Sequence, residues 1–333
     1  GPPGVMSRPG EPIIIAHRGA CAYLPEHTLE AKALAIGLGA DYIEQDVVIT
    51  RDGVPIVTHD IFLEDVTDVT ARFPGRARAD GHCHAIDFTL QEIRSLRRFE
   101  RVDDQGRQVF AHRFPVTSVR FNVVTLAEEI EFLQGINHSM GLDVGLYTEV
   151  KYPAWHRRQG HDISRIVLET LSRYDYDSRD SNVYFQCFDA SELERVRQEL
   201  HCDLRLIQLV GENAWKESDT DYDALRTGEG LDRVARHADG IGPEISQLVE
   251  WDDRGIAGSK GLAAAAHARG LKIHPYTHRV DSLPPNAPDS RTVLKILFED
   301  EHVDGIFSDF TDEVARFLGR HGPRRLPNPA SGR

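Results

Sequence analysis

The sequence of 333 residues is poor in cysteine, lacks a long apolar segment and has no excess of basic residues. Its four cysteines form no CxxC pair, so a thiolate metal site is not expected, and disulfides are permitted but not required in a chain of this length. No apolar run approaches the ~20 residues of a membrane-spanning helix. The formal net charge is −14, which argues against broad nucleic-acid binding and against stable attachment to anionic membranes.

The two ends of the chain differ in composition from the rest. Residues 1–12 begin GPPGVMSRPG, which is typical of a protease-cleavage scar followed by a flexible leader. Residues 320–333 are rich in Pro, Arg and Gly and are predicted to form a flexible tail. Residues 13–319 are expected to form one domain, because α/β barrels of ~250 residues or more commonly fold as a single unit.

Short apolar runs alternate with segments of helical periodicity throughout this domain. Strands are predicted at residues 13–16, 41–48, 55–58, 144–149, 183–186, 204–209, 238–242, 271–276 and 305–308. Helices are predicted at residues 28–38, 126–134, 163–174, 190–200, 230–237, 257–269, 291–299 and 311–318. This alternation predicts an α/β fold of the TIM-type (β/α)₈ barrel class, in which the active site lies at the C-terminal ends of the strands.

An irregular insertion, at about residues 61–122, interrupts the pattern after the third strand. It is rich in Arg, Asp, Gly and His, and only one helix is predicted within it, at residues 89–97. Thr89 and Glu92 have the spacing of a capping box at the start of that helix. A long irregular segment inside a compact domain is usually functional or disordered.

Polar side chains gather beside the first three predicted strands. His17 and Arg18 follow the first strand, and His59 follows the third. Glu44 and Asp46 are two positions apart on the second strand, so their side chains point to the same face. Histidine suits proton transfer near neutral pH, and arginine suits phosphate or carboxylate groups. The stretch predicts acid–base chemistry on an anionic substrate, although each residue alone could be a solvated strand end or a hydrogen-bonded loop residue.

Further candidates follow later strands. Glu149, with the carboxylate pair of the second strand, would supply the hard oxygen ligands that Mg²⁺ or Ca²⁺ prefers. The alternative is that each carboxylate pairs with Lys or Arg. Lys151 should point the same way as Glu149 and either contact a phosphoryl oxygen or neutralise a carboxylate. Gln186 and Tyr276 lie at later strand ends. Aromatic residues there, Tyr276 among them, could line a substrate pocket or pack between barrel and helices.

Stretches across residues 13–319 resemble the glycerophosphodiester phosphodiesterases, in particular the longer periplasmic bacterial type. Among them are AHRGACAYLPEHTLEA, EQDVVITRDGVPIVTHD, LYTEVKYP, VYFQCFDASEL, KIHPYTHR and VDGIFSDF. The resemblance implies a TIM barrel with an insertion after the HD motif. It also implies hydrolysis of glycerophosphodiesters such as glycerophosphocholine to glycerol 3-phosphate and an alcohol.

The resemblance further implies roles for individual residues. It assigns His17 and His59 to acid–base catalysis and Arg18 to phosphate binding. It assigns one divalent cation, Ca²⁺ with Mg²⁺ as the alternative, to Glu44, Asp46 and Glu149. Further substrate contacts are expected from Lys151, Glu26, Gln186 and Tyr276. The glycerol 2-hydroxyl lies next to the phosphate ester and is a pre-placed nucleophile, so a cyclic phosphate intermediate is expected.

Two departures from the family pattern are visible, and neither is itself a residue of the proposed catalytic set. His27 stands in PEHT where many members have an asparagine, and the last strand ends FSDF where endings like TDFP are usual. The expected partner is a small glycerophosphodiester, with no nucleic acid and no stable membrane insertion. The resemblance favours a periplasmic or secreted location, with the cytoplasm as the alternative.

Two other functions remain open at this point. One is a phospholipase-D-like lipid phosphodiesterase on the same fold, although the acidic loops argue against a membrane-facing rim. The other is a non-catalytic phosphodiester-binding barrel, against which the pair His17 and His59 weighs, because binding alone needs no acid–base couple.

Overall fold

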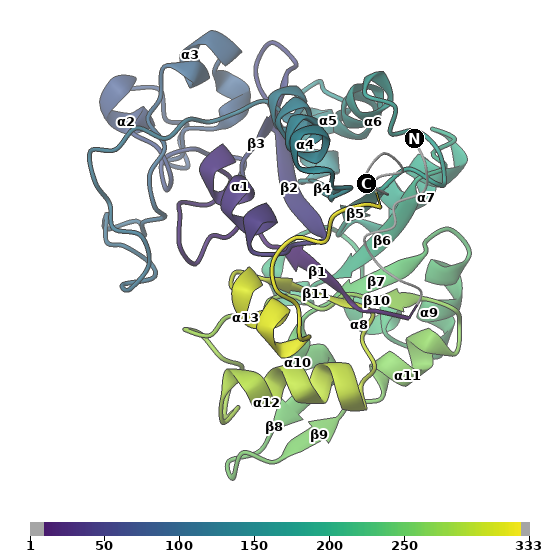
Figure 1. The fold of residues 1–333 in the computed structure, drawn as a ribbon. Helices are drawn as coiled ribbons and strands as arrows, with labels where there is room; N and C mark the ends of the chain where they lie inside the picture. Colours follow the sequence, from purple (N-terminus) through teal and green to yellow (C-terminus); the bar gives the residue numbers. More distant parts are fainter. Residues whose placement is uncertain (1–9, 328–333) are drawn as a thin grey trace.

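The computed structural model describes residues 10–327 and shows a nearly closed barrel of parallel strands with helices outside it (Figure 1). The strand order around the barrel is β10-β7-β6-β5-β4-β2-β1-β11. These strands are β1 (Ile13–Ala16), β2 (Tyr42–Ile49), β4 (Gly145–Val150), β5 (Val183–Cys187), β6 (Arg205–Val210), β7 (Gly240–Pro243), β10 (Lys272–Ile273) and β11 (Gly305–Ser308). The predicted α/β barrel is confirmed.

Helices cover the outer face of the barrel and begin at polar capping residues. The side chains of Thr28, Thr125 and Asp189 accept hydrogen bonds from the first backbone N–H groups of α1, α4 and α7. The outer helices are α1 (Leu29–Gly37), α4 (Leu126–Met140), α5 (Pro153–Arg158), α6 (Ile163–Arg173), α7 (Ala190–Gln198), α8 (Tyr222–Leu225), α9 (Gly228–Ala235), α10 (Ile245–Leu248), α11 (Leu262–His267), α12 (Ser290–Lys295) and α13 (Thr311–Phe317). A single 3₁₀ turn forms η2 (Asn213–Trp215), and α12 continues into the π-helical segment η3 (Ile296–Asp300).

Large side chains fill the inside of the barrel below its C-terminal rim. Tyr42, Tyr147, Tyr184 and Phe307 pack together there. The hydroxyl of Tyr147 is hydrogen bonded to Nδ1 of His274 at 2.8 Å, which makes His274 a core residue. The interior of the barrel is therefore packed, so the active site is expected at its C-terminal rim and not inside it.

The strand β3 (Pro55–Val57) is not part of the barrel, contrary to the interpretation of residues 13–60 as three barrel strands. It pairs antiparallel with β2, with Val57 opposite Val47 and Pro55 opposite Ile49. The turn at residues 51–53 is too short for a crossover between parallel strands. Strand β2 thus continues past the rim, and β3 returns the chain to the rim. There the Thr58 N–H donates to the carbonyl of Asp46 at 2.9 Å.

The predicted helix at residues 257–269 is wrong in its first part. Residues Ala257–Ser259 form β9, which pairs antiparallel with β8 (Val249–Trp251). Gly261 has φ of 78°, a left-handed conformation that separates the hairpin from α11. The alanine-rich sequence favours a helix, and the hairpin with its glycines limits that helix to Leu262–His267.

The insertion forms a small unit with its own apolar core against β2 and β3. Its regular elements are α2 (Val69–Arg72), η1 (Ala85–Asp87) and α3 (Leu90–Arg94), and Figure 1 shows α2 and α3 to one side of the barrel. Leu63, Phe88 and Ile93 are fully buried together with Val48 of β2 and Ile56 of β3. The predicted capping box of Thr89 and Glu92 is present at the start of α3.

Parts of the predicted leader and tail, residues 1–9 and 328–333, lie outside the described residues. The described part of the tail is docked and not frayed, because Arg320 pairs with the buried Asp41 at 2.6 Å and Arg324 reaches the same carboxylate at 3.1 Å. All four cysteines are buried free thiols. Among residues 10–327, no helix is both long and apolar enough to cross a bilayer.

Candidate active site

A cavity of about 490 Å³ opens at the C-terminal rim of the barrel. Most of the predicted site residues line it: His17, Arg18, Glu44, Asp46, His59, Glu149, Lys151, Gln186 and Tyr276. Glu26 does not line the cavity. It lies behind Arg18, whose Nη1 donates to Glu26 Oε1 at 3.2 Å. The structure therefore brings together residues that are up to 259 positions apart, from His17 to Tyr276.

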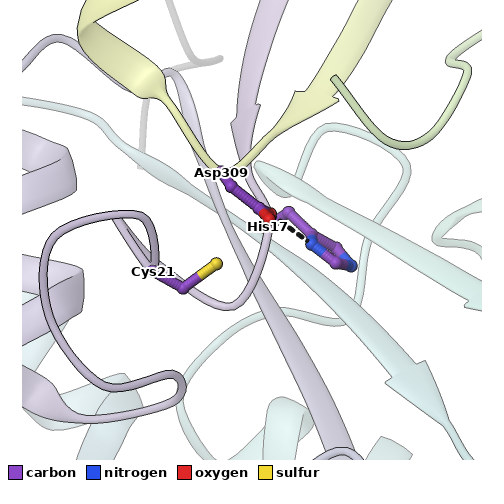
Figure 2. A group of neighbouring side chains, drawn as sticks. All are labelled: His17, Cys21 and Asp309. Atoms are coloured by element: carbon purple, nitrogen blue, oxygen red, sulfur yellow. Dashed lines mark hydrogen bonds and ion pairs between the residues drawn. The ribbon is translucent and has the colours of Figure 1, made fainter. Parts of the chain in front are cut away.

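His17 follows β1 and is held by an aspartate from the other end of the chain. Its Nδ1 donates to Oδ1 of Asp309, directly after β11, at 2.6 Å (Figure 2). Its Nε2 lies 3.8 Å from Glu44 Oε1 on the cavity wall. Burial lowers the pKa of His17 below its ordinary value, and Asp309 opposes this effect. The ring is thus fixed with Nδ1 toward Asp309 and Nε2 toward the cavity.

His59 follows β3 and is anchored in the same way. Its Nδ1 donates to Oδ1 of Asp60 at 2.9 Å. Burial lowers the pKa of His59 to about 4, and the positive charges of Arg18 and Lys151 contribute. At neutral pH the ring is therefore neutral in the free protein. Its Nε2 has no bond to the described chain and is available to a ligand.

Two cationic side chains face the cavity between the histidines. Lys151 is buried, and its Nζ lies 3.2 Å from Glu149 Oε2. Burial lowers the pKa of Lys151, but Glu149, Glu217 and Asp46 together raise it above its ordinary value. Arg18 likewise keeps its charge, because Glu26 raises its pKa against the effect of burial. Both groups can contact an anion at neutral pH.

The alternation predicted for β2 is confirmed. Glu44 and Asp46 face the cavity, whereas Gln45 points to the opposite face, where its Nε2 donates to Glu129 at 2.5 Å. The two carboxylates lie in the middle of β2 and not at its end, because the strand extends past the rim into the hairpin with β3. Glu149 is the register partner of Asp46 on the neighbouring strand β4.

These three carboxylates repel one another. Burial raises the pKa of Glu44 well above its ordinary value, and Asp46 and Glu149 add to the rise. Burial also raises the pKa of Glu149. Burial also raises the pKa of Asp46, but the hydrogen bond from His27 Nε2 at 2.7 Å and the nearby groups His59 and Lys151 together hold it well below its usual range.

Glu44 and Asp46, together with His27, lie close enough to one another to share a metal ion, and Glu149 is the neighbour of Asp46 on β4. Carboxylate oxygens suit a hard divalent cation. Glu44 Oε1 is buried and has no hydrogen-bond partner within residues 10–327. A cation would supply that missing partner and offset the repulsion between the carboxylates.

His17, Cys21 and Asp309 also lie close together (Figure 2). Asp309 is already bonded there by Arg113 at 2.9 Å and Arg279 at 2.8 Å, so we assign this group to the orientation of His17.

Gln186 and Tyr276 complete the cavity wall differently. Gln186 is fully buried, and neither atom of its amide has a partner in the described chain. A buried amide that faces a cavity without partners is a candidate for binding polar ligand groups. The hydroxyl of Tyr276 already donates to the carbonyl of Val210 at 2.6 Å, so its ring lines the cavity while its polar atom is engaged.

Sequence reasoning missed several residues of the site. Glu217 and Trp215, from the loop after β6, line the cavity, as does Arg279 from the loop after β10. Asp309, the partner of His17, was not predicted either. Its position two residues before a helix gave no sign of that bond. Nothing in the insertion sequence pointed to the arginine that reaches Asp309.

The chain is similar to known proteins along nearly its whole length. A model of the glycerophosphoryl diester phosphodiesterase family matches residues 17–313. A glycerophosphodiester phosphodiesterase of Haemophilus influenzae is 40% identical, covering 92% of this chain and 89% of that protein. One of Treponema pallidum is 35% identical, covering 93% and 92%. The chain belongs to the glycerophosphoryl diester phosphodiesterase family. The resemblance seen in the sequence is thereby confirmed at the level of the family.

Solved structures of this phosphodiesterase family share the fold. A phosphodiesterase of Oleispira antarctica, solved with the product sn-glycerol-3-phosphate, has a TM-score of 0.62 at 20% identity. The structural match covers 93% of this chain and 97% of the Oleispira antarctica chain. The family match begins at His17 and ends beyond Asp309, so it contains the insertion and every residue of the cavity wall named above.

Proposed function

We propose that this member of the phosphodiesterase family hydrolyses glycerophosphodiesters, such as glycerophosphocholine, to glycerol 3-phosphate and an alcohol. One observation carries the proposal. Two histidines, each bonded through Nδ1 to an aspartate, lie with their Nε2 atoms free at one cavity that also holds Arg18 and Lys151. The relative from Oleispira antarctica that binds sn-glycerol-3-phosphate supports a product of this class.

The first step is an attack by the substrate's own 2-hydroxyl on phosphorus. One histidine accepts the hydroxyl proton at Nε2 as the new P–O bond forms, which closes a five-membered cyclic phosphate. The bond from phosphorus to the alcohol oxygen breaks, and the other histidine supplies a proton to that oxygen. The nucleophile is already part of the bound molecule, so this step has a large proximity advantage. Arg18 and Lys151 stabilise the charge on the phosphoryl oxygens.

The second step opens the cyclic phosphate with water. A histidine that ended the first step neutral takes a proton from the water, and its partner returns a proton to the 2-oxygen of glycerol. The product is glycerol 3-phosphate, and both histidines regain their starting protonation. The pKa values of both rings are lowered in the free protein, so either ring can act first as the base. The histidine that acts as the acid must take up a proton at Nε2 when the anionic phosphodiester binds, because a nearby negative charge favours the charged imidazolium.

The carboxylates Glu44, Asp46 and Glu149 would hold one divalent cation, with Ca²⁺ preferred and Mg²⁺ as the alternative. When bound, the cation supplies Lewis-acid stabilisation of negative charge on the phosphate. His27 keeps Asp46 ionised through its hydrogen bond and so keeps one ligand ready for the ion. Gln186 is suited to bind a hydroxyl of the glycerol moiety.

The test is a coupled assay for glycerol 3-phosphate with glycerophosphocholine as substrate, in Ca²⁺, in Mg²⁺ and in excess EDTA. We expect turnover with a cation and its loss in EDTA. His17→Ala and His59→Ala should each lower kcat by about 10²- to 10⁴-fold and leave the fold intact. A substrate analogue without the 2-hydroxyl should not be cleaved. Cleavage of that analogue at a normal rate would exclude the cyclic route.

The same assay separates the competing functions. Cleavage of lysophosphatidylcholine in preference to glycerophosphocholine would favour a lipid phosphodiesterase. Tight binding of glycerophosphocholine without turnover would favour a binding protein. The periplasmic or secreted location is part of the proposal on the basis of resemblance, and fractionation of the source cells tests it.

A further inference from the structure

His17, His59 and Arg18 of the site are held by carboxylates that bind arginine side chains of the insertion. Arg101 and Arg113 belong to residues 61–122 and do not line the cavity. Each makes charged hydrogen bonds to carboxylates that in turn hold His17, Arg18 or His59. The insertion is therefore connected to the site through two arginines. A single carboxylate side chain lies between each arginine and each site residue that it supports.

Arg101 joins the anchors of two site residues. Its Nε and Nη2 donate to the two oxygens of Glu26 at 2.7 and 3.0 Å, and its Nη1 donates to Asp60 Oδ2 at 2.8 Å. Glu26 accepts from Arg18, and Asp60 accepts from His59. One planar guanidinium thus sets the position of both carboxylates at once, which a lysine could not do.

Arg113 acts on the other histidine. Its Nη2 donates to Asp309 Oδ2 at 2.9 Å, and Oδ1 of the same carboxylate accepts from His17. A bidentate pair with Asp281, at 2.9 and 3.0 Å, fixes the guanidinium in place. Only 4% of the Arg113 side chain is exposed, so this bond lies away from competing water. Arg279 supports Asp309 from the barrel side at 2.8 Å.

We propose that the insertion is a positioning unit for catalysis, in which Arg101 orients His59 and Arg18 while Arg113 orients His17. This inference rests on the proposed function, because it takes those three residues to be the groups that contact substrate. It adds that the barrel alone does not hold them in a productive arrangement. Arg101 and Arg113 are positioning residues, since neither contacts the cavity.

The two arginines predict different kinetic signatures. Arg113 reaches only the acid–base group His17, so Arg113→Ala should lower kcat about 10-fold with KM changed less than about twofold. Arg101 reaches both His59 and the phosphate-binding Arg18, so Arg101→Ala should lower kcat by about 10- to 100-fold and raise KM by about fivefold. These sizes correspond to misplacement of catalytic groups by about 1 Å or less.

The insertion offers a matched control. Arg78 makes a bidentate ion pair with Asp87 at 2.7 and 2.8 Å and does not line the cavity. Arg78→Ala should leave kcat and KM unchanged. Circular dichroism and Tm for every variant establish the folded fraction. Arg101→Lys and Arg113→Lys retain the charge if the alanine variants do not fold, and they should show smaller losses in the same pattern.

A double-mutant cycle tests whether Arg101 acts through Asp60. If it does, Asp60→Asn should lower kcat much less in the Arg101→Ala protein than in the wild type, because the link is already broken. Additive losses would overturn this path. A general loss of stability would produce no such coupling.

The outcomes separate the inference from the proposed function. If the wild type is active and His17→Ala and His59→Ala are not, while folded Arg101→Ala and Arg113→Ala keep kcat/KM within twofold, the positioning role is wrong and the function stands. If the wild type releases no glycerol 3-phosphate, or the histidine variants keep full activity, the proposed function fails and the positioning role fails with it. The expected kinetic split with an inert Arg78→Ala supports the inference.

Discussion

Glu100 in the insertion provides a test of the electrostatics that does not depend on activity. The residue is 4% exposed, and its Oε1 is buried without a hydrogen-bond partner in the described chain. Burial raises the pKa of Glu100 to about 8, and Glu26 adds to the rise, while Arg113 and Arg101 oppose it. The folded protein therefore keeps this carboxyl protonated at a pH where the unfolded chain has lost the proton.

The sign and size of the effect follow from linkage. The folded state binds more protons than the unfolded state between the two pKa values, about 4.5 and 8, so stability falls as pH rises through that window. Each pKa unit corresponds to about 1.4 kcal/mol, so the loss due to Glu100 approaches about 4 to 5 kcal/mol above pH 8. Glu100→Gln cannot ionise, and it should be more stable than the wild type by about 4 kcal/mol at pH 9 and similar to it at pH 4.5.

Urea unfolding followed by tryptophan fluorescence at pH 5, 7 and 9 measures this difference directly. Glu169→Gln, on the exposed face of α6, is the control and should show the pH profile of the wild type. The reasoning is refuted if Glu100→Gln has the same pH profile as the wild type, or if it is less stable than the wild type at pH 9.

Three further predictions concern the carboxylate cluster, the tail and a helix cap. Glu44→Gln should stabilise the metal-free protein at pH 8, because burial, Asp46 and Glu149 raise the pKa of Glu44 well above its ordinary value, and it should reduce the rise in Tm caused by Ca²⁺. Calorimetry in EDTA and in Ca²⁺ measures both effects, and a lower Tm in EDTA would contradict the first. Arg320→Ala removes a partner of the buried Asp41 and should cost about 3 kcal/mol in urea unfolding, whereas a loss below about 0.5 kcal/mol would show that Arg324 suffices. Thr89→Ala should cost about 1 kcal/mol through loss of the α3 cap, with Thr89→Ser close to the wild type.

Local patterns predicted the features that depend on local physics. The two-residue period of a strand placed Glu44 and Asp46 on one face, and the structure confirms it. The spacing of Thr89 and Glu92 predicted a capping box that is present. These predictions succeeded because each depends on the geometry of a few consecutive residues.

The direction of β3 could have been predicted but was not. The chain has only a tight turn between Ile49 and Pro55, and such a turn joins antiparallel strands, because a parallel pair needs a crossover of a dozen or more residues. The apolar composition of β3 resembles that of the barrel strands, so composition alone did not show that β3 runs antiparallel to β2. The hairpin of β8 and β9 was missed for a similar reason, since the alanine-rich sequence after it has strong helix propensity.

The contacts that hold the site in place could not be predicted from the sequence. The bond between His17 and Asp309 and the bonds of Arg101 join segments that meet only when the barrel is formed. In the insertion, arginine and aspartate occur so often that no spacing distinguishes Arg101 or Arg113 from the arginines that pair at the surface. Ion-pair partners follow from tertiary packing, and periodicity carries no information about them.

The pairing of β1 with β11 has a consequence for the order in which the protein becomes active. His17 and the aspartate that fixes its ring are 292 positions apart, and they meet because the first and last strands of the barrel are neighbours. During synthesis, a chain that has not reached residue 309 can collapse around its early strands but has no group to hold His17. If His17 acts as proposed, catalysis needs the complete, closed barrel, and a fragment that ends before β11 is expected to be inactive.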